Sequence, residues 1–140
     1  LFDVKNKKFP SLICFESTFP EINRRHVKLG ADFLTYIVND GWYTTPPQPQ
    51  QHMKQSIFRA IENRKTVLRC ANTGISAIID PSGKIREITK LNEKSIITSF
   101  IKKGNRVTFY TNYGNVFAIM MLIITGAFLI MTYKKDEQTK

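Results

Sequence analysis

Residues 10–42 read PSLICFESTFPEINRRHVKLGADFLTYIVNDGW, and this stretch decides the fold. It holds two short apolar runs, PSLIC at residues 10–14 and FLTYIV at residues 33–38, and the second run is rich in β-branched and aromatic residues. Short apolar runs of this kind are typical of buried strands. We therefore predict a strand at each run.

A helix is predicted between the two strands. Thr18 is suited to cap its start, Glu21 stands three residues later at the capping-box position, and Pro20 falls in the first turn. Gly30 is a common residue just past a helix end, so the helix is expected to run to Leu29.

The same alternation continues after a loop at residues 39–48 that is rich in Gly, Thr and Pro. A second helix is predicted from Pro49 to about Arg64, with an apolar face made of Met53, Ile57, Phe58 and Ile61. Strands are expected at residues 66–71, 75–80 and 94–101, and the turn sequence Pro81-Ser-Gly83 makes 75–88 a hairpin. The order β-α-β-α-β-β-β favours an α/β layered fold.

The C-terminal stretch at residues 116–133, VFAIMMLIITGAFLIMTY, contains no charged residue. As a helix its roughly 18 residues would extend about 27 Å, close to the thickness of a bilayer core. Tyr113 and Tyr133 flank it, as aromatic residues do at membrane interfaces. We predict a transmembrane helix, and the alternative is a buried core helix. Its orientation stays open, because basic residues stand on both sides: Lys102, Lys103 and Arg106 before it, and Lys134, Lys135 and Lys140 after it.

The chain carries 21 Lys and Arg against 11 Asp and Glu, a formal net charge of +10. No arginine-rich tract or zinc spacing accompanies this charge, so nucleic acid is not the expected partner. An anionic membrane surface is the better expectation. The sequence begins at Leu1 and shows no signal-peptide pattern, which indicates a fragment of a longer protein or a processed chain.

Two cysteines, Cys14 and Cys70, are too few for a disulfide scaffold and fit no zinc motif. His26 and His52 have no partner residues at metal-ligand spacing, so neither a metal nor another cofactor is expected. Cys14 ends a strand and precedes a turn into a helix, a recurring place for an exposed nucleophile. The nearby helix N-terminus also favours a thiolate. Taken alone, the same pattern also fits a buried structural thiol.

Asn39, Asp40 and Trp42 follow the second predicted strand and are candidates for a binding site at its end. The plainer interpretation is an Asx turn with a packed tryptophan. Arg59 and Glu62 stand three residues apart on the second helix, the spacing of a surface ion pair.

Six short motifs follow one another along the chain: Leu12-Ile-Cys-Phe-Glu16, Asn39-Asp-Gly-Trp42, Gln51-His52, Arg59-Ala-Ile-Glu62, Arg69-Cys-Ala-Asn-Thr-Gly-Ile-Ser76 and Ile79-Asp-Pro-Ser-Gly83. Taken in this order, they resemble the nitrilase superfamily and, within it, the apolipoprotein N-acyltransferase family. Tyr110-x-x-x-Gly114 before an apolar helix also resembles that family's C-terminus.

The resemblance implies the C-terminal part of a nitrilase-like αββα sandwich, followed by one transmembrane helix, on the periplasmic face of the bacterial inner membrane. The expected divisions are a catalytic-domain part at 1–103, a connector at 104–115, the helix at 116–133 and a polar tail at 134–140. The implied activity is transfer of an acyl chain from a phospholipid to the N-terminal diacylglyceryl-cysteine amine of an apolipoprotein, through a cysteine thioester.

The family's Cys, Glu, Lys triad is matched here at Cys14 only, since the Glu and Lys lie upstream in the family. The resemblance gives supporting or pocket roles to Phe15, Glu16, Asn39, Asp40 and Trp42, and structural roles to Arg59, Glu62, Asn72 and Gly74. Phe15 departs from the Tyr often found in the family and so lacks a hydroxyl. Cys70 is expected to be core packing. The 140 residues alone are expected to be inactive.

Two alternatives remain open. One is a membrane-anchored nitrilase-type amidase, against which the terminal helix argues. The other is a non-catalytic, membrane-anchored fragment, which the missing triad members favour.

Overall fold

The computed structural model describes residues 1–42, 47–91, 93–101, 104 and 106–138 of the chain. Lys102, Lys103 and Lys140 of the charge argument lie outside the described residues, as does the middle of the predicted loop at 39–48.

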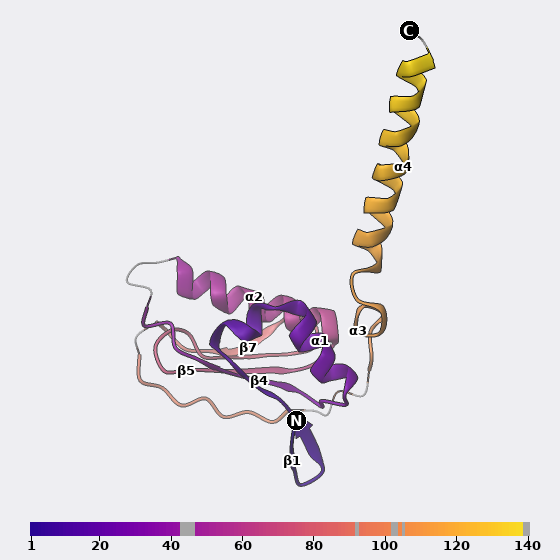
Figure 1. The fold of residues 1–140 in the computed structure, drawn as a ribbon. Coiled ribbons are helices and arrows are strands. Elements are labelled where there is room, and N and C mark those ends of the chain that lie inside the picture. The colour runs from indigo at the N-terminus through magenta and orange to yellow at the C-terminus, as the bar shows by residue number, and fades with distance from the viewer. Residues whose placement is uncertain (43–46, 92, 102–103, 105, 139–140) are drawn as a thin grey trace.

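A five-stranded sheet forms the centre of the domain (Figure 1). Its strands lie side by side in chain order: β3 (Ser11–Ile13), β4 (Leu34–Val38), β5 (Val67–Ala71), β6 (Ala77–Ile79) and β7 (Ile85–Ile88). The first three are parallel, and β6 and β7 add to them antiparallel. The carboxyl ends of β3, β4 and β5 therefore meet at one edge, where loop residues from each can converge.

Two helices make the crossovers between the parallel strands. α1 (Pro20–Lys28) joins β3 to β4, and α2 (Gln48–Asn63) joins β4 to β5. Both steps move in the same direction across the sheet, so right-handed crossovers place both helices on the same face, as Figure 1 shows. The sheet residues beneath them, Leu34, Tyr36 and Val38, are buried.

A buried polar pair also ties the sheet to α1. The Tyr36 hydroxyl donates to Asn23 Oδ1 at 2.6 Å, and both side chains are fully buried. Burial raises the pKa of Tyr36 far above its usual range, so the phenol remains a neutral donor.

The opposite face of the sheet is open in part. Ile37 on β4 is 54% exposed and Cys70 on β5 is exposed, so the expectation that Cys70 packs in the core is wrong for this chain. Residues 93–101 pass along this face in extended form, where Ile97 lines the same hollow as Ile37. The strand predicted at 94–101 is therefore wrong: this segment has no strand pairing.

The start of α1 differs from the prediction. Phe19, which has no side-chain cap, stands at the N-cap position, and the helix begins at Pro20. Thr18 instead ends a short 3-10 helix, η1 (Cys14–Thr18), where its hydroxyl donates to Phe15 O at 2.7 Å. Glu21 binds arginine side chains further along α1 in place of a capping box.

An N-terminal hairpin was not predicted. β1 (Phe2–Val4) and β2 (Lys7–Phe9) pair antiparallel around Lys5 and Asn6, which have φ of 48° and 63°. A two-residue turn with both residues left-handed favours Gly. The sequence Lys-Asn gives only a weak signal for it.

The buried face of α2 is more polar than the predicted stripe. Met53 is buried, but Phe58 is 57% exposed and Ile61 is 38% exposed. The side chains that α2 buries are Pro49, His52, Met53, Ser56, Arg59, Ala60 and Asn63.

The C-terminal part contains α3 (Phe109–Tyr113) and α4 (Val116–Gln138). Within α4, Val116–Lys134 is long and apolar enough to cross a membrane, with a mean hydropathy of 2.3 and no burial against the domain. α3 is attached to the domain: Arg24 donates to Thr111 O at 2.8 Å, and the buried Thr111 hydroxyl donates to Asn63 Oδ1 at 3.2 Å. The apolar helix thus starts a few residues after a fixed contact.

Candidate active site

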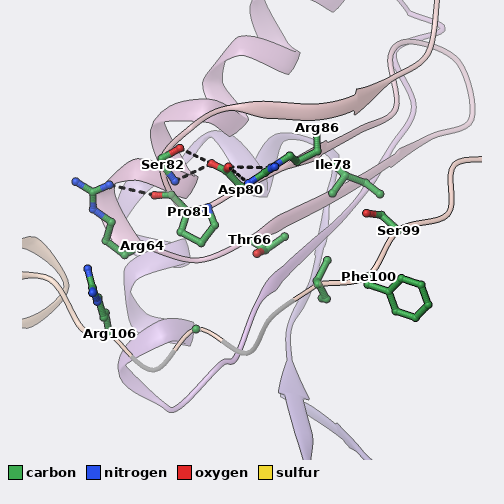
Figure 2. Close-up of a pocket in the computed structure, with 12 residues that line it drawn as sticks. Arg64, Thr66, Ile78, Asp80, Pro81, Ser82, Arg86, Ser99, Phe100 and Arg106 are labelled. Carbon is green, nitrogen blue, oxygen red and sulfur yellow. Dashed lines mark hydrogen bonds and ion pairs between the residues drawn. The ribbon is translucent and has the colours of Figure 1, made fainter.

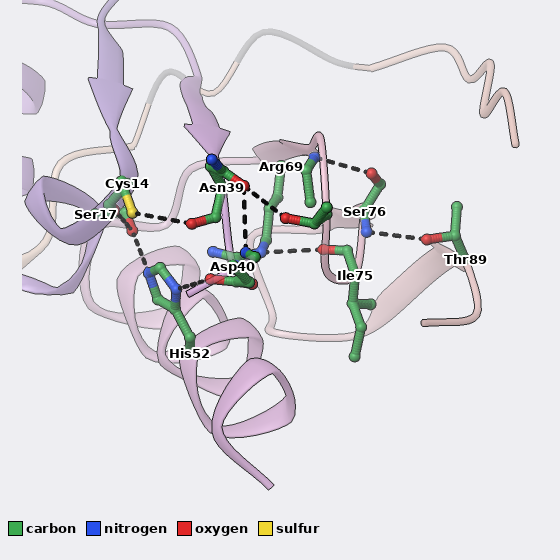
Figure 3. Close-up of polar contacts among 12 residues, drawn as sticks. Cys14, Ser17, Asn39, Asp40, His52, Arg69, Ile75, Ser76 and Thr89 are labelled. Carbon is green, nitrogen blue, oxygen red and sulfur yellow. Dashed lines mark hydrogen bonds and ion pairs between the residues drawn. The ribbon is translucent and has the colours of Figure 1, made fainter. Parts of the chain in front are cut away.

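Cys14 stands where β3 becomes η1, at the carboxyl edge of the parallel strands (Figure 3). Its φ of 49° lies in the left-handed region, and its side chain is half-buried. The Sγ atom is 3.8 Å from Asn39 O, which follows the neighbouring strand. The thiol therefore projects from a sharp turn at the end of a strand, beside the next strand end.

Two side chains of η1 form hydrogen bonds that constrain this turn. Glu16 Oε2 accepts from Ile13 N at 2.7 Å, and the Ser17 hydroxyl donates to Cys14 O at 2.6 Å. A left-handed conformation costs a non-glycine residue about 1–2 kcal/mol. Such strain persists only where surrounding contacts fix it. The two contacts on either side of Cys14 supply that constraint.

Asp40 is a buried carboxylate that follows Asn39, the residue beside the thiol, and it is 2% exposed. It contacts two side chains. Its Oδ1 lies 2.7 Å from His52 Nδ1, and its Oδ2 accepts from Arg69 Nη2 at 2.9 Å. Arg69 also donates to Ile75 O at 3.1 Å. Burial lowers the pKa of Arg69, and the adjacent Asp40 carboxylate works against that effect.

The chain of contacts continues from Asp40 to the nucleophile turn. His52 Nε2 lies 3.3 Å from Ser17 Oγ, the same hydroxyl that donates to Cys14 O (Figure 3). Ser17, His52 and Asp40 thus stand in the order of a hydrolase triad. Ser17 is only 2% exposed and its one hydroxyl proton goes to the Cys14 carbonyl, so it is not placed to attack a substrate. The Cys14 thiol is half-buried and therefore the more accessible of the two side chains.

His52 is the residue that sequence reasoning missed. It was weighed as a metal ligand and placed in a motif without a role, whereas the structure buries it to 4% exposure between Asp40 and Ser17. Its place in the Gln51-His52 motif was the only signal available. No group of three potential metal-binding His, Cys, Asp or Glu residues occurs in the part of the chain that the structure describes.

The other predicted pocket residues lie around the same edge. Asn39 Oδ1 accepts from Thr73 Oγ1 at 2.6 Å, which closes the loop after β4. Phe15 is 54% exposed and stacks on His52 with ring centroids 5.2 Å apart. Trp42 is 82% exposed, so it is available for contact outside the described domain.

The predicted structural residues are more buried than expected. Arg59 and Glu62 do not form a surface pair: Arg59 is 7% exposed, donates to Glu62 Oε1 at 2.9 Å, and donates to Thr18 O at 3.0 Å. Burial raises the pKa of Glu62. Arg59 thereby joins α2 to the end of η1.

The motif after β5 supports Asp40 from the other side. The backbone N–H of Asn72 donates to Val38 O at 2.8 Å. Gly74 has φ of 118°, and a Cβ atom there would overlap Oδ2 of Asp40. Only glycine lets the loop pass so close to the carboxylate.

A separate hollow of about 810 Å³ lies at the turn between β6 and β7 (Figure 2). Its lining includes Arg64, Asp80, Arg86 and Arg106 and none of the Cys14 group. Asp80 is engaged in the turn itself, because it accepts from Ser82 at 2.6 Å and from Arg86 at 3.0 Å. Its contacts are those of a structural turn.

Comparisons with known proteins agree with this fold. The sequence model of the carbon-nitrogen hydrolase family matches residues 1–106. Among solved structures, Saccharomyces cerevisiae Nit3, a member of branch 10 of the nitrilase superfamily, is 26% identical with a TM-score of 0.55, over 66% of this chain and 36% of that chain. A carbon-nitrogen hydrolase from Helicobacter pylori G27 is 16% identical with a TM-score of 0.57, over 64% of this chain and 39% of that chain.

Curated relatives also match most of the chain. The apolipoprotein N-acyltransferase of Geobacter metallireducens is 43% identical over 107 residues, which are 76% of this chain and 20% of the relative. That of Rickettsia bellii is 40% identical over 137 residues, which are 97% of this chain and 27% of the relative. The chain thus spans about a quarter of the length of these relatives. The predicted fold class, a nitrilase-like α/β domain followed by one apolar helix, is confirmed, and the chain belongs to the carbon-nitrogen hydrolase family.

Proposed function

We propose that this chain provides the nucleophile and a membrane anchor of an apolipoprotein N-acyltransferase. The observation that carries the proposal is the combination, on one carbon-nitrogen hydrolase chain, of an accessible thiol in a strained strand-end turn and a helix of membrane-spanning length. An enzyme whose acyl donor is a phospholipid needs its nucleophile beside a bilayer. The curated relatives named for this activity support the same assignment.

The reaction proceeds in two steps through Cys14. Its thiolate attacks the carbonyl carbon of a phospholipid ester, a C–S bond forms, the C–O bond breaks, and the lysophospholipid oxygen takes a proton. The α-amino group of an apolipoprotein's diacylglyceryl-cysteine then attacks the thioester. A C–N bond forms, the C–S bond breaks, and the amine gives up a proton as the thiol is restored. Division into two acyl transfers is ordinary nucleophilic catalysis.

In this proposal the general base for the thiol lies outside the described residues. Within the described residues the Sγ partner is the backbone carbonyl of Asn39, which cannot take up the proton at neutral pH. We therefore assign the general base and the oxyanion-stabilising cation to an upstream Glu and Lys. The isolated chain is accordingly expected to show no acyl transfer.

The surrounding residues have supporting roles in this proposal. Glu16 fixes the turn through Ile13 N, and the loop of Asn39 and Asp40 forms the wall beside the thiol. The exposed rings of Phe15 and Trp42 are assigned to the acyl-chain pocket, because a fatty acyl chain needs apolar contact.

The positions of α3 and α4 support a proposed membrane arrangement. Val116–Lys134 has 19 residues and would extend about 28 Å, enough to span a bilayer core. The Thr111 contacts keep the start of this helix close to α1 and α2. We place the catalytic part at 1–103, the connector at 104–115, the span at 116–133 and the tail at 134–140, with the catalytic part on the periplasmic side of the inner membrane.

The test is intact mass spectrometry of the complete gene product after incubation with a defined phosphatidylethanolamine, with Cys14→Ser as the control. The expected result is an acyl-sized mass gain that hydroxylamine removes and that Cys14→Ser lacks. Hydrolysis of short amides without an acyl adduct would favour the amidase alternative. Neither adduct nor amide hydrolysis would favour a non-catalytic membrane-anchored protein.

A further inference from the structure

The buried contacts beneath Cys14 form one continuous path from the sheet to the nucleophile. Arg69 on β5 holds Asp40, Asp40 holds His52 on α2, His52 contacts Ser17, and Ser17 holds the carbonyl of Cys14. We propose that His52 is a positioning residue for the nucleophile: it fixes Ser17, and through it the left-handed turn that directs the Cys14 thiol. This inference rests on the proposed role of Cys14 and adds a residue to it.

The geometry of His52 leaves it little freedom. Its side chain is 4% exposed, its Nδ1 is 2.7 Å from the Asp40 carboxylate, and the Phe15 ring stacks on it at an interplanar angle of 18°. An ionised carboxylate only accepts hydrogen bonds, so Nδ1 carries a proton that it donates to Asp40. This bond fixes the ring orientation and thus the place of Nε2 beside Ser17, as a carboxylate does for a metal-binding histidine.

Ser17 transmits that position to Cys14. Its hydroxyl is buried and gives its one proton to Cys14 O at 2.6 Å. Its oxygen is therefore the acceptor in the 3.3 Å contact with His52 Nε2, which is a hydrogen bond when Nε2 carries a proton. Since the carbonyl belongs to the residue with φ of 49°, a shift of Ser17 changes the backbone that carries the thiol. A displacement of about 1 Å at a reacting group can lower a rate about 100-fold.

This role is separate from proton transfer. Among the described residues the hydrogen-bond partner of Cys14 Sγ is Asn39 O, and the two His52 nitrogens contact Asp40 and Ser17. His52 therefore acts on the thiol through the turn and not as its base.

Two substitutions test separately the contact of Nδ1 with Asp40 and the contact of Nε2 with Ser17. His52→Asn keeps a donor near the place of Nδ1 for Asp40 and removes the group beside Ser17. His52→Gln places its amide near the Nε2 position and so keeps contact with Ser17. Ser56→Ala is the matched control on the same helix, since Ser56 is 1% exposed and its Oγ has no hydrogen-bond partner among the described residues.

The experiment uses the complete gene product in a Cys70→Ser background, so that Cys14 is the only cysteine of this region. Single-turnover acylation by phosphatidylethanolamine gives the rate constant at saturation and the half-saturating lipid concentration. Alkylation by iodoacetamide reports the presentation of the thiol without any acyl donor. The unfolding temperature establishes that each variant is folded.

We expect His52→Asn to lower the acylation rate constant by about 10- to 100-fold, with the half-saturating concentration changed less than about threefold. His52→Gln should recover most of the rate, and Ser56→Ala should match the parent. Alkylation of Cys14 should slow in the same order. If His52→Asn does not fold, Ser17→Ala breaks the same path by removing one oxygen and is expected to give the same loss.

Two results would overturn the proposal: an acylation rate of folded His52→Asn within threefold of the parent, or equal losses in the Asn and Gln variants. If the parent protein forms no acyl adduct, the proposed function fails instead. In that case the alkylation rates of Cys14 alone decide the positioning role, because they need no acyl donor.

Discussion

The Asp40→Asn substitution tests how much the buried Asp40 carboxylate contributes to the free energy of unfolding. The substitution keeps the shape of the side chain and removes its charge. Asp40 has two donors within hydrogen-bond distance, His52 Nδ1 at 2.7 Å and Arg69 Nη2 at 2.9 Å. An amide has only one acceptor oxygen, so its NH₂ group would have to face one of these two donors.

The size of the effect follows from burial. The side chains of Asp40, His52 and Arg69 are 1%, 4% and 0% exposed, so solvent cannot replace the lost contact. Arg69 Nη1 already has no hydrogen-bond partner among the described residues, so the guanidinium would keep only its bond to Ile75 O. Loss of one partner of a buried ion pair costs about 3–5 kcal/mol, and we expect Asp40→Asn to fall in this range.

The assay is denaturant unfolding of the complete gene product in detergent, followed by far-ultraviolet circular dichroism. Asp3→Asn is the matched control on the exposed N-terminal hairpin, and it should change the unfolding free energy by less than about 0.5 kcal/mol. The double variant Asp40→Asn with Arg69→Met should recover at least about 1 kcal/mol relative to Asp40→Asn, since the unpaired buried cation is then gone. A loss for Asp40→Asn no larger than that for Asp3→Asn would refute the reasoning.

Two further results are expected. Gly74→Ala should lower the unfolding temperature more than Gly30→Ala. Both glycines have positive φ, but a Cβ atom at Gly74 would overlap the buried Asp40 carboxylate, whereas a Cβ atom at Gly30 would have no neighbour within 4 Å. Equal losses in the two variants would show that backbone strain alone causes the effect. Hydrogen bonds from Arg24, and to a smaller extent from Arg25, lower the pKa of Glu21 from 4.5 to about 2. A lowered pKa stabilises the fold above the unfolded value, so the difference in unfolding temperature between the parent and Glu21→Gln should be constant above about pH 5 and disappear as the pH falls from 4.5 to about 2.

The parts of the fold that sequence could predict are those with local signals. The strands at 34–38 and 67–71 and the hairpin at 75–88 were expected from apolar runs and a Pro-Ser-Gly turn, and they form in the structure. The segment 94–101 has the same composition but forms no strand. A strand also needs a free edge beside it, and this segment lies along the face of the sheet. Composition carries no information on that geometry.

The candidate site divides in the same way. Cys14 and Asp40 were identified because each stands at the end of a predicted strand, which is a local feature. His52 connects them by contacting Asp40, 12 positions away, and Ser17, 35 positions away. No periodicity in the sequence indicates these two contacts. The pair of Arg59 and Glu62 was expected on the surface because the sequence shows their spacing of three residues. It does not show the contact of Arg59 with Thr18 O, which is far away along the chain.

The polar stripe on α2 explains why its amphipathic pattern was misleading. His52, Ser56, Arg59 and Asn63 recur at helical spacing and are all buried, although helix prediction expects an apolar stripe there. His52 and Arg59 contact η1, and Asn63 accepts from Thr111 of α3, the helix before α4. His52 and Asn63 are eleven positions apart, which corresponds to about 16 Å along the helix axis. The helix α2 thus connects the turn that carries Cys14 with the segment that leads into the apolar helix α4. In the function proposed above, the buried contacts of His52, Arg59 and Asn63 keep the Cys14 thiol at a fixed place relative to that apolar helix.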